Sequence, residues 1–190
     1  LGTMPHALIA AYDGDTVVAT QKFDQYIDPK VERIALVDFH NDSVTTSLEV
    51  ARALGGRLAG VRLDTSENMI DASLEDLVGS PIRSLRHQPT IETWEKVTKS
   101  LRGVNPKLVL RVREALDGEG FNNVGIFVSG GFNSEKIAKF EALGLPIVGY
   151  GVGSYLFDRR GRKFEYTADV VEPVAKVGRR LWNGPELHRV

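Results

Sequence analysis

The sequence predicts an α/β fold built on a parallel sheet, and two observations lead to this expectation. Short apolar runs alternate with longer segments of helical periodicity along residues 33–153. The apolar runs end on charged residues or on glycine. Alternation of strand and helix at this spacing is typical of βα units, in which each helix returns the chain to a parallel strand.

The first part of the pattern contains two strands and the helix between them. The predicted strands are residues 33–39 and 57–64. Val44, Leu48, Ala51 and Leu54 fall on one helical face within residues 43–56. We expect Asp42 or Ser43 to cap the start of this helix and Gly55 to close its end.

The second part continues the alternation after a loop with one helical turn, predicted for residues 65–90. The predicted helices are residues 90–101, 107–116 and 133–144, and the predicted strands are residues 123–129 and 146–153. Asn133 is the expected N-cap of the last helix, and Gly144 is expected to follow its end.

The number of strands leaves the architecture open. Four parallel strands are predicted, with the N-terminal segment as a candidate fifth, whereas a (β/α)₈ barrel needs eight and an open doubly wound sheet needs fewer. The last part of the chain has a different pattern, with a basic turn and an alternating strand. We therefore divide the chain into residues 1–157, the α/β unit, and residues 158–190, a C-terminal appendage.

Composition excludes several function classes. The formal net charge of −1 gives no bulk attraction to nucleic acid or to an anionic membrane. No apolar run approaches the roughly 18 residues of a membrane span. The chain has no cysteine, which excludes disulfides and thiolate chemistry. We expect a cytoplasmic protein with neither nucleic acid nor membrane as a partner.

Charged residues lie where the first two predicted strands end, which is where parallel α/β folds place their active residues. Asp38 ends the first strand, and Arg62 and Asp64 end the second. Residues two apart on a strand face the same side, so Arg62 and Asp64 can form an ion pair. Asp38 could also cap the following helix, and the residues alone leave both interpretations open.

Glycines and hydroxyls follow the next two predicted strands. One set is Ser129-Gly130-Gly131, and the other is Gly151-Val152-Gly153-Ser154. Glycine allows close approach to the backbone, and amides at a helix start attract anions. A Ser-Gly-Gly sequence is also a common tight turn, but two such loops on consecutive strands favour a phosphate-binding site.

Six segments, in order over nearly all of residues 1–180, resemble nicotinate phosphoribosyltransferase, a type II phosphoribosyltransferase. They are GTMPHALI, ALVDF, VRLDTSEN, IFVSGGFNSEKI, GYGVGSYL and YTADVVEPVAKVGR. The first is similar to the family's Gly-Thr-x-x-His segment, the third to its Arg-x-Asp strand end, and the fourth to its phosphate loop. The resemblance implies the C-terminal half of an irregular TIM-like (β/α) barrel with a C-terminal strand appendage.

The resemblance also implies a reaction. Nicotinate attacks the anomeric carbon of phosphoribosyl pyrophosphate, giving nicotinate mononucleotide and pyrophosphate, and ATP hydrolysis is coupled through a phosphorylated histidine that corresponds to His6. Asp38 and Asp64 are expected to face the ribose and to bind Mg²⁺, while Arg62 counters the charge of pyrophosphate. The remaining expected contacts to substrate and phosphate are Thr3, Ser129, Gly130, Gly131, Gly151, Gly153 and Ser154.

The sequence departs from the family pattern in two places. Many members read Arg-x-Asp-Ser-Gly at the second strand, whereas Thr65-Ser66-Glu67 follows Asp64 here. The family also has an N-terminal domain and early barrel strands before its Gly-Thr segment, which opens this chain. We expect residues 1–190 to fold stably, and to be active, only with that N-terminal half, supplied by another chain, by a cleaved part of the protein or by a close homo-oligomer.

Two alternatives remain open. Quinolinate phosphoribosyltransferase has the same architecture, but it would need basic residues for a second substrate carboxylate and no phosphorylatable histidine. His6 in its Gly-Thr context argues for nicotinate. The other alternative is a non-catalytic chain that binds a nucleotide or serves as an assembly subunit.

Overall fold

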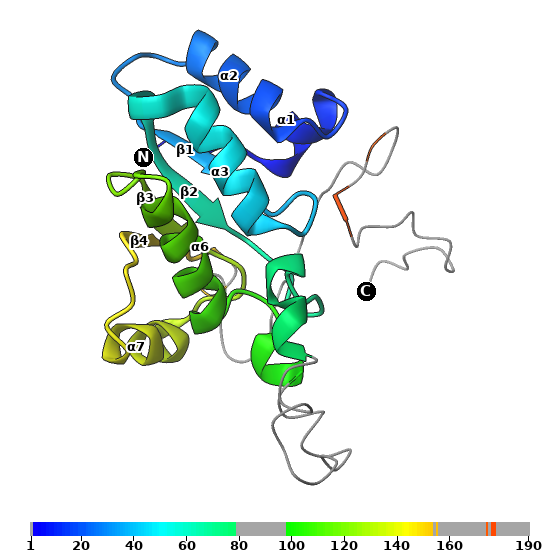
Figure 1. Ribbon diagram of the computed structural model, residues 1–190, viewed down its shortest axis with the longest axis vertical. Helices are drawn as coiled ribbons and strands as arrows, with labels where there is room; N and C mark the ends of the chain where they lie inside the picture. The colour runs from blue at the N-terminus through cyan, green and yellow to red at the C-terminus, as the bar shows by residue number, and fades with distance from the viewer. Residues whose placement is uncertain (1, 79–97, 154, 156–173, 175, 178–190) are drawn as a thin grey trace, which may run out of the picture.

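The computed structural model describes residues 2–78, 98–153, 155, 174, 176 and 177 (Figure 1). Most of the predicted C-terminal appendage, residues 158–190, lies outside these residues. The same holds for most of the helix predicted over residues 90–101 and for Ser154, one of the predicted phosphate contacts.

Helices and strands alternate from residue 33 onward, as the sequence predicts. The elements are α1 (His6–Ala11), α2 (Thr16–Tyr26), β1 (Arg33–Leu36), α3 (Ser43–Leu54), η1 (Gly55–Arg57), β2 (Leu58–Leu63), η2 (Ala72–Leu74), α6 (Pro106–Gly118), β3 (Gly125–Val128), α7 (Ser134–Ala142) and β4 (Gly149–Tyr150). The helices α1 and α2 are not predicted from the sequence. The candidate fifth strand at the N-terminus is wrong, because that segment forms an isolated parallel bridge between Thr3 and Ile34 instead.

The four strands form one parallel sheet in the order β1-β2-β3-β4. Each strand therefore pairs with the next strand in the sequence. A doubly wound sheet reverses its strand order at a switch point, whereas a barrel adds successive strands in one direction. The predicted α/β fold is confirmed, and the strand order is that of part of a (β/α) barrel.

Side chains and one glycine fix the ends of the predicted helices. The Asp42 carboxylate accepts a hydrogen bond from the Thr45 amide at 3.1 Å and caps α3. The Asn133 side chain accepts one from the Lys136 amide at 2.8 Å and caps α7. Gly55 ends α3 with a φ of 56°, a conformation that costs glycine little. These are the caps that the sequence predicts.

The main hydrophobic core lies between one face of the sheet and the helices α3 and α6, which lie side by side in Figure 1. Alternate strand residues point into it, including Val61 and Leu63 of β2 and Ile126 and Val128 of β3, all fully buried. Burial of each such side chain stabilises the fold by about 1.5–3 kcal/mol. A second cluster joins α1, α2 and β1 and contains Met4, Ile9, Ala10, Ala19, Leu36 and Phe39.

Phe127 alternates with Ile126 and Val128, so it lies on the opposite face of the sheet. Its ring spans glycines on both neighbouring strands. A Cβ atom at Gly60 of β2 would lie 2.6 Å from the ring, and one at Gly149 of β4 would lie 3.0 Å from it. The ring thus occupies the space that side chains on β2 and β4 would otherwise fill.

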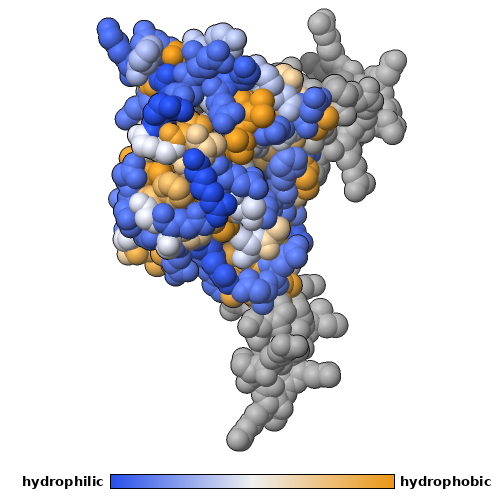
Figure 2. Space-filling model, turned by 45° about the horizontal axis from the view of Figure 1, so that its top comes forward, coloured by the Kyte–Doolittle hydropathy of each residue, from blue (hydrophilic) through white to orange (hydrophobic). Residues whose placement is uncertain are grey.

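The surface is mixed in character. Figure 2 shows a face on which hydrophilic residues predominate and hydrophobic residues lie in small, separate areas. None of the helices that the structure describes is long and apolar enough to cross a membrane.

Candidate active site

The predicted site residues meet at the carboxyl ends of the strands. Because β1, β2 and β3 are parallel neighbours, their ends share one edge of the sheet, and Asp38, Asp64 and Ser129 follow them there. The bridge between Thr3 and Ile34 holds the N-terminal segment beside β1 and so brings His6, the first residue of α1, to the same edge.

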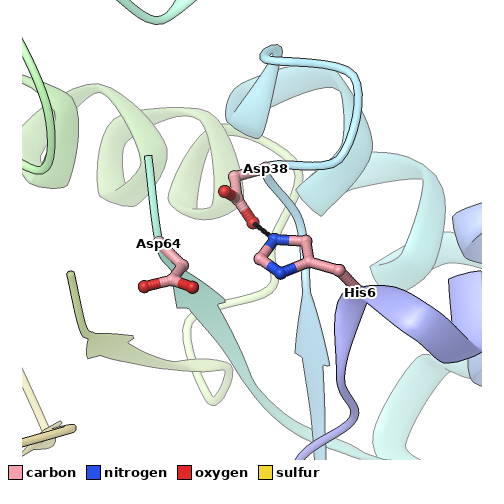
Figure 3. A group of neighbouring side chains, drawn as sticks. All are labelled: His6, Asp38 and Asp64. Carbon is pink, nitrogen blue, oxygen red and sulfur yellow. Dashed lines mark hydrogen bonds and ion pairs between the residues drawn. The ribbon is translucent and has the colours of Figure 1, made fainter. Parts of the chain in front are cut away.

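His6 and Asp38 form a buried pair. His6 Nε2 lies 2.9 Å from Asp38 Oδ1, and Figure 3 shows the ring nitrogen directed at the carboxylate. The Asp38 side chain is fully buried, and the His6 side chain is 14% exposed. Because an ionised carboxylate can only accept, Nε2 carries the hydrogen of this bond, and Nδ1 lies on the side of the ring away from Asp38.

A lysine from far along the chain completes this pair. Lys176 Nζ forms an ion pair with Asp38 Oδ2 and donates a hydrogen bond to the Asp64 carbonyl at 3.2 Å. The Lys176 side chain is 4% exposed. Burial alone raises the pKa of the Asp38 carboxyl, but the hydrogen bond from His6 and the charge of Lys176 outweigh it, so this pKa lies below its usual value. Asp38 is therefore ionised at neutral pH.

A second network joins the ends of β2 and β3. The Ser129 hydroxyl donates to Asp64 Oδ1 at 2.7 Å and accepts from Arg62 at 3.1 Å. Arg62 also lies 3.7 Å from Asp64 Oδ2, which confirms that the two residues face the same side of the strand. Its remaining donors reach Thr3 Oγ1 at 3.1 Å and the Met4 carbonyl at 3.0 Å, and so tie the N-terminal segment to β2.

We call His6, Asp38, Arg62, Asp64 and Lys176 the charged cluster. It contains two acids, two cations and one histidine at one edge of the sheet. Fixed charges in a largely buried position can stabilise charge that develops during a reaction.

Residues 130–131 and 151–153 form the two glycine loops. Gly130 and Gly131 have φ values of 86° and 66°, which favour glycine. A Cβ at Gly130 would lie 3.3 Å from Asp64 Oδ1, and one at Gly131 would overlap the carboxylate of Glu67. The first loop therefore needs glycine mainly for its conformation, because the exposed Glu67 side chain can move away from a Cβ at Gly131.

The second loop offers less backbone than the sequence suggests. The Gly151 amide donates to the Val128 carbonyl at 2.7 Å, so its hydrogen is used within the sheet. Among the residues that the structure describes, no atom lies within 4 Å of a Cβ placed at Gly153. Of the predicted contacts in this loop, Gly153 remains available to a phosphate group and Gly151 does not.

The structure thus brings Thr3, His6, Asp38, Arg62, Asp64 and Ser129 into one connected set. The sequence prediction missed Lys176 and Glu67. Lys176 lies in one of the segments that carry the resemblance, but several basic residues follow it nearby, and no spacing relates it to Asp38, 138 positions earlier. Glu67 is visible in the sequence as the third residue after Asp64, at the departure from the family pattern.

A search of solved structures relates the chain to the phosphoribosyltransferases. One similar structure is the crystal structure of nicotinate-nucleotide pyrophosphorylase from Pyrococcus furiosus, with 34% sequence identity and a TM-score of 0.56. The alignment covers 82% of this chain and 31% of that chain, so the chain spans about a third of the structure it matches. No family model matches the chain, and a search of curated proteins also finds no match.

This similarity supports the general class that the sequence predicts, which is a phosphoribosyltransferase of pyridine-nucleotide metabolism. It does not distinguish the nicotinate enzyme from the quinolinate enzyme, because nicotinate nucleotide is the product of both reactions.

Proposed function

We propose that this chain contributes to the active site of a nicotinate phosphoribosyltransferase. In this reaction the pyridine nitrogen of nicotinate forms a bond to the anomeric carbon of phosphoribosyl pyrophosphate, and the bond from that carbon to pyrophosphate breaks. The observation that carries the proposal is the His6–Asp38 pair beside Asp64, Arg62 and Ser129, in a chain that is 34% identical to a nicotinate-nucleotide pyrophosphorylase over the aligned part.

The charged cluster suits the charges of this reaction. Positive charge develops on the ribose and negative charge on the leaving pyrophosphate as the bond breaks. Asp64 can face the ribose, because its side chain is 24% exposed and both its oxygens are held, by Ser129 and Arg62. Arg62 can counter the charge of pyrophosphate, since its side chain is 20% exposed at the same edge.

The geometry of His6 suits a role in ATP coupling. Asp38 holds Nε2, which leaves the Nδ1 lone pair as the nucleophile for the γ-phosphoryl group of ATP. Transfer would form a bond between Nδ1 and phosphorus and release ADP, and later hydrolysis would release phosphate. Asp38 would stabilise the positive charge that the ring gains.

Mg²⁺ would accompany the pyrophosphate, and the two predicted ligands differ in how well they fit it. Mg²⁺ prefers oxygen ligands and usually binds through one or two carboxylates while keeping several waters. Asp64 fits because its carboxylate is partly exposed. Asp38 does not fit, because its side chain is fully buried and already paired with the Lys176 ammonium, so a hydrated ion has no access to it. We therefore assign Mg²⁺ to Asp64, where it would neutralise the charge of the leaving group.

The chain would act together with further polypeptide. The described sheet has four strands, and a closed (β/α) barrel has eight. We propose that the remaining strands, and part of the nicotinate pocket, come from outside this chain or from a second copy of it.

Product formation by the full protein tests the proposal. Incubation with nicotinate, phosphoribosyl pyrophosphate, ATP and Mg²⁺ should yield nicotinate mononucleotide. His6→Ala should lose stimulation by ATP and the acid-labile label from γ-labelled ATP while keeping a slow transfer. Asp64→Asn should lose most of the transfer itself. Equal labelling of His6→Ala and wild type would contradict the role of His6, and full activity of Asp64→Asn would contradict the site.

Quinolinate is the second candidate substrate. The similar structure from Pyrococcus furiosus is that of an enzyme named for nicotinate nucleotide, which is also the product of quinolinate transfer once one carboxylate leaves as CO₂. The cations Arg62 and Lys176 lie within the same cluster, so a second substrate carboxylate has basic partners nearby. Release of CO₂ with quinolinate, and no product with nicotinate, would favour this alternative.

A further inference from the structure

The charged cluster contains a ligand set that could hold a metal ion. His6, Asp38 and Asp64 each offer one ligand atom, and these atoms lie within 4.8 Å of one another. Figure 3 shows that the three side chains come from α1 and from the ends of two neighbouring strands, with His6 and Asp38 directed at each other and Asp64 beside them. One histidine and two carboxylates at this spacing are a set that a divalent transition metal would bind.

Lys176 lies against this ligand set. Its ammonium group pairs with one ligand residue, Asp38, and donates to the backbone carbonyl of another, Asp64, so it bridges the ends of β1 and β2. A lysine that only stabilised the fold could extend its ammonium into water, as exposed lysines do. This ammonium ends in the interior instead, at 4% exposure, where it needs an acid as its partner.

We propose that Lys176 is a positioning residue that prevents a divalent metal ion from binding to His6. Its ammonium occupies the place of the cation and neutralises the charge of Asp38. The Asp38 oxygens are already held by His6 and Lys176. A metal ion that bound Asp38 would lie close to the ammonium, and two cations repel each other strongly in a buried position. The His6 imidazole consequently stays free of metal.

With Lys176 at this position, one site can bind a metal-dependent substrate and also contain a nucleophilic histidine. A metal ion on the imidazole would use the lone pair that a reaction needs. With Lys176 in place, the partly exposed Asp64 is the member of this ligand set that can still take a divalent ion. The proposal concerns metal binding by the free protein, so it can fail while the proposed reaction holds, and it can hold while the reaction fails.

Mn²⁺ binding to the full protein, without substrate, tests the proposal. Lys176→Met removes the ammonium and keeps an unbranched side chain. It should bind Mn²⁺ about tenfold more tightly than wild type, because the Asp38 carboxylate loses its cation and lies beside Asp64 and His6. Pulsed electron paramagnetic resonance should detect a directly coordinated nitrogen in this variant, and adding His6→Ala should remove that signal. Lys176→Arg keeps the charge and should resemble wild type.

Lys139→Met is the matched control, because it removes one positive charge from an exposed pair on α7, away from the cluster. A folded Lys176→Met that binds Mn²⁺ no more tightly than Lys139→Met would overturn the proposal. If Lys176→Met does not fold, the same measurement is made on wild type. A coordinated nitrogen in wild type that disappears in His6→Ala would overturn the proposal. No coordinated nitrogen at saturating Mn²⁺, in wild type and in Lys176→Arg, supports it.

Discussion

The charged cluster and the glycine loops lie at the same edge of the sheet, but they are built differently. The cluster is made of side chains that are far apart in the sequence, and each is held by at least one other member or by Ser129. The loops are made of backbone, and the first of them lies close to the carboxylates of Asp64 and Glu67. Substitutions should therefore damage the cluster through unpaired charge and the loops through lost space.

The largest expected effect is on the cluster. Asp38→Ala leaves the buried Lys176 without its carboxylate, and removing one partner of a buried ion pair typically costs about 3–5 kcal/mol. Denaturation by urea should show this loss of stability. Lys139→Ala, which breaks an exposed pair, should leave the urea midpoint nearly unchanged. Similar urea midpoints for the two variants would mean that the Asp38–Lys176 pair contributes little to the stability of the fold.

A smaller effect is expected in the glycine loops. Gly131→Ala places a side chain at a φ of 66° and against Glu67, and the conformation alone costs roughly 1–2 kcal/mol. Gly153→Ala is the matched control for stability, because its Cβ would meet no atom of the described residues within 4 Å. If both loops hold a phosphate group, both variants should bind inorganic phosphate more weakly, although only Gly131→Ala loses stability. Unchanged phosphate affinity in both would place the phosphate site elsewhere.

Ser129 connects the two regions, and its substitution should have a moderate effect. Ser129→Ala removes the hydroxyl between Arg62 and Asp64, and one such hydrogen bond contributes about 1 kcal/mol. Thermal unfolding of Ser129→Ala can be compared with Ser134→Ala, whose hydroxyl is exposed. An equal shift in both variants would show that the hydroxyl does not link the two charges.

The smallest effect is expected from a change in pH, because this loss of stability occurs only in acid and is absent near neutral pH. The folded-state pKa of Asp38 lies below its usual value, since the hydrogen bond from His6 and the charge of Lys176 outweigh burial. Ionised Asp38 therefore stabilises the fold at pH values above about 4, and this contribution is lost as the pH falls further. Urea midpoints from about pH 5 to about pH 3 should fall more steeply in wild type than in Asp38→Asn. Parallel curves would contradict this.

Much of the fold could be predicted because its signals are local. The caps Asp42, Asn133 and Gly55 and the apolar strands are read from neighbouring residues, and the structure confirms them. The helices α1 and α2 were missed for different reasons. α1 has 6 residues and no capping side chain at its start, so its sequence resembles a loop. α2 has 11 residues and is capped by Asp15, a local signal that the sequence prediction overlooked. Their position depends on packing against β1, which is a tertiary effect.

The site residues also differ in whether the sequence alone could predict them. Asp38, Arg62, Asp64 and Ser129 could be predicted to lie together because parallel strands bring their ends to one edge. His6 joined them through its resemblance to a family motif, and no local signal points to it. Lys176 could not be predicted, because one buried lysine looks like an exposed one in a sequence and only the fold shows which acid it meets.

The Phe127 ring limits which substitutions the two neighbouring strands can accept. Its ring fills the space beside Gly60 and Gly149, so residues on three strands share one volume. Contacting residues are energetically coupled, and their substitutions do not add. A Cβ at Gly149 lies close to the Phe127 ring, whereas a Cβ at Gly60 would also lie 2.8 Å from the Gly125 carbonyl oxygen. Alanine at Gly149 should therefore be harmful beside phenylalanine and tolerated beside a smaller residue at 127, whereas alanine at Gly60 should be harmful in both cases. Positions 127 and 149 are expected to evolve as one unit, with a large residue on β3 keeping its neighbour on β4 small.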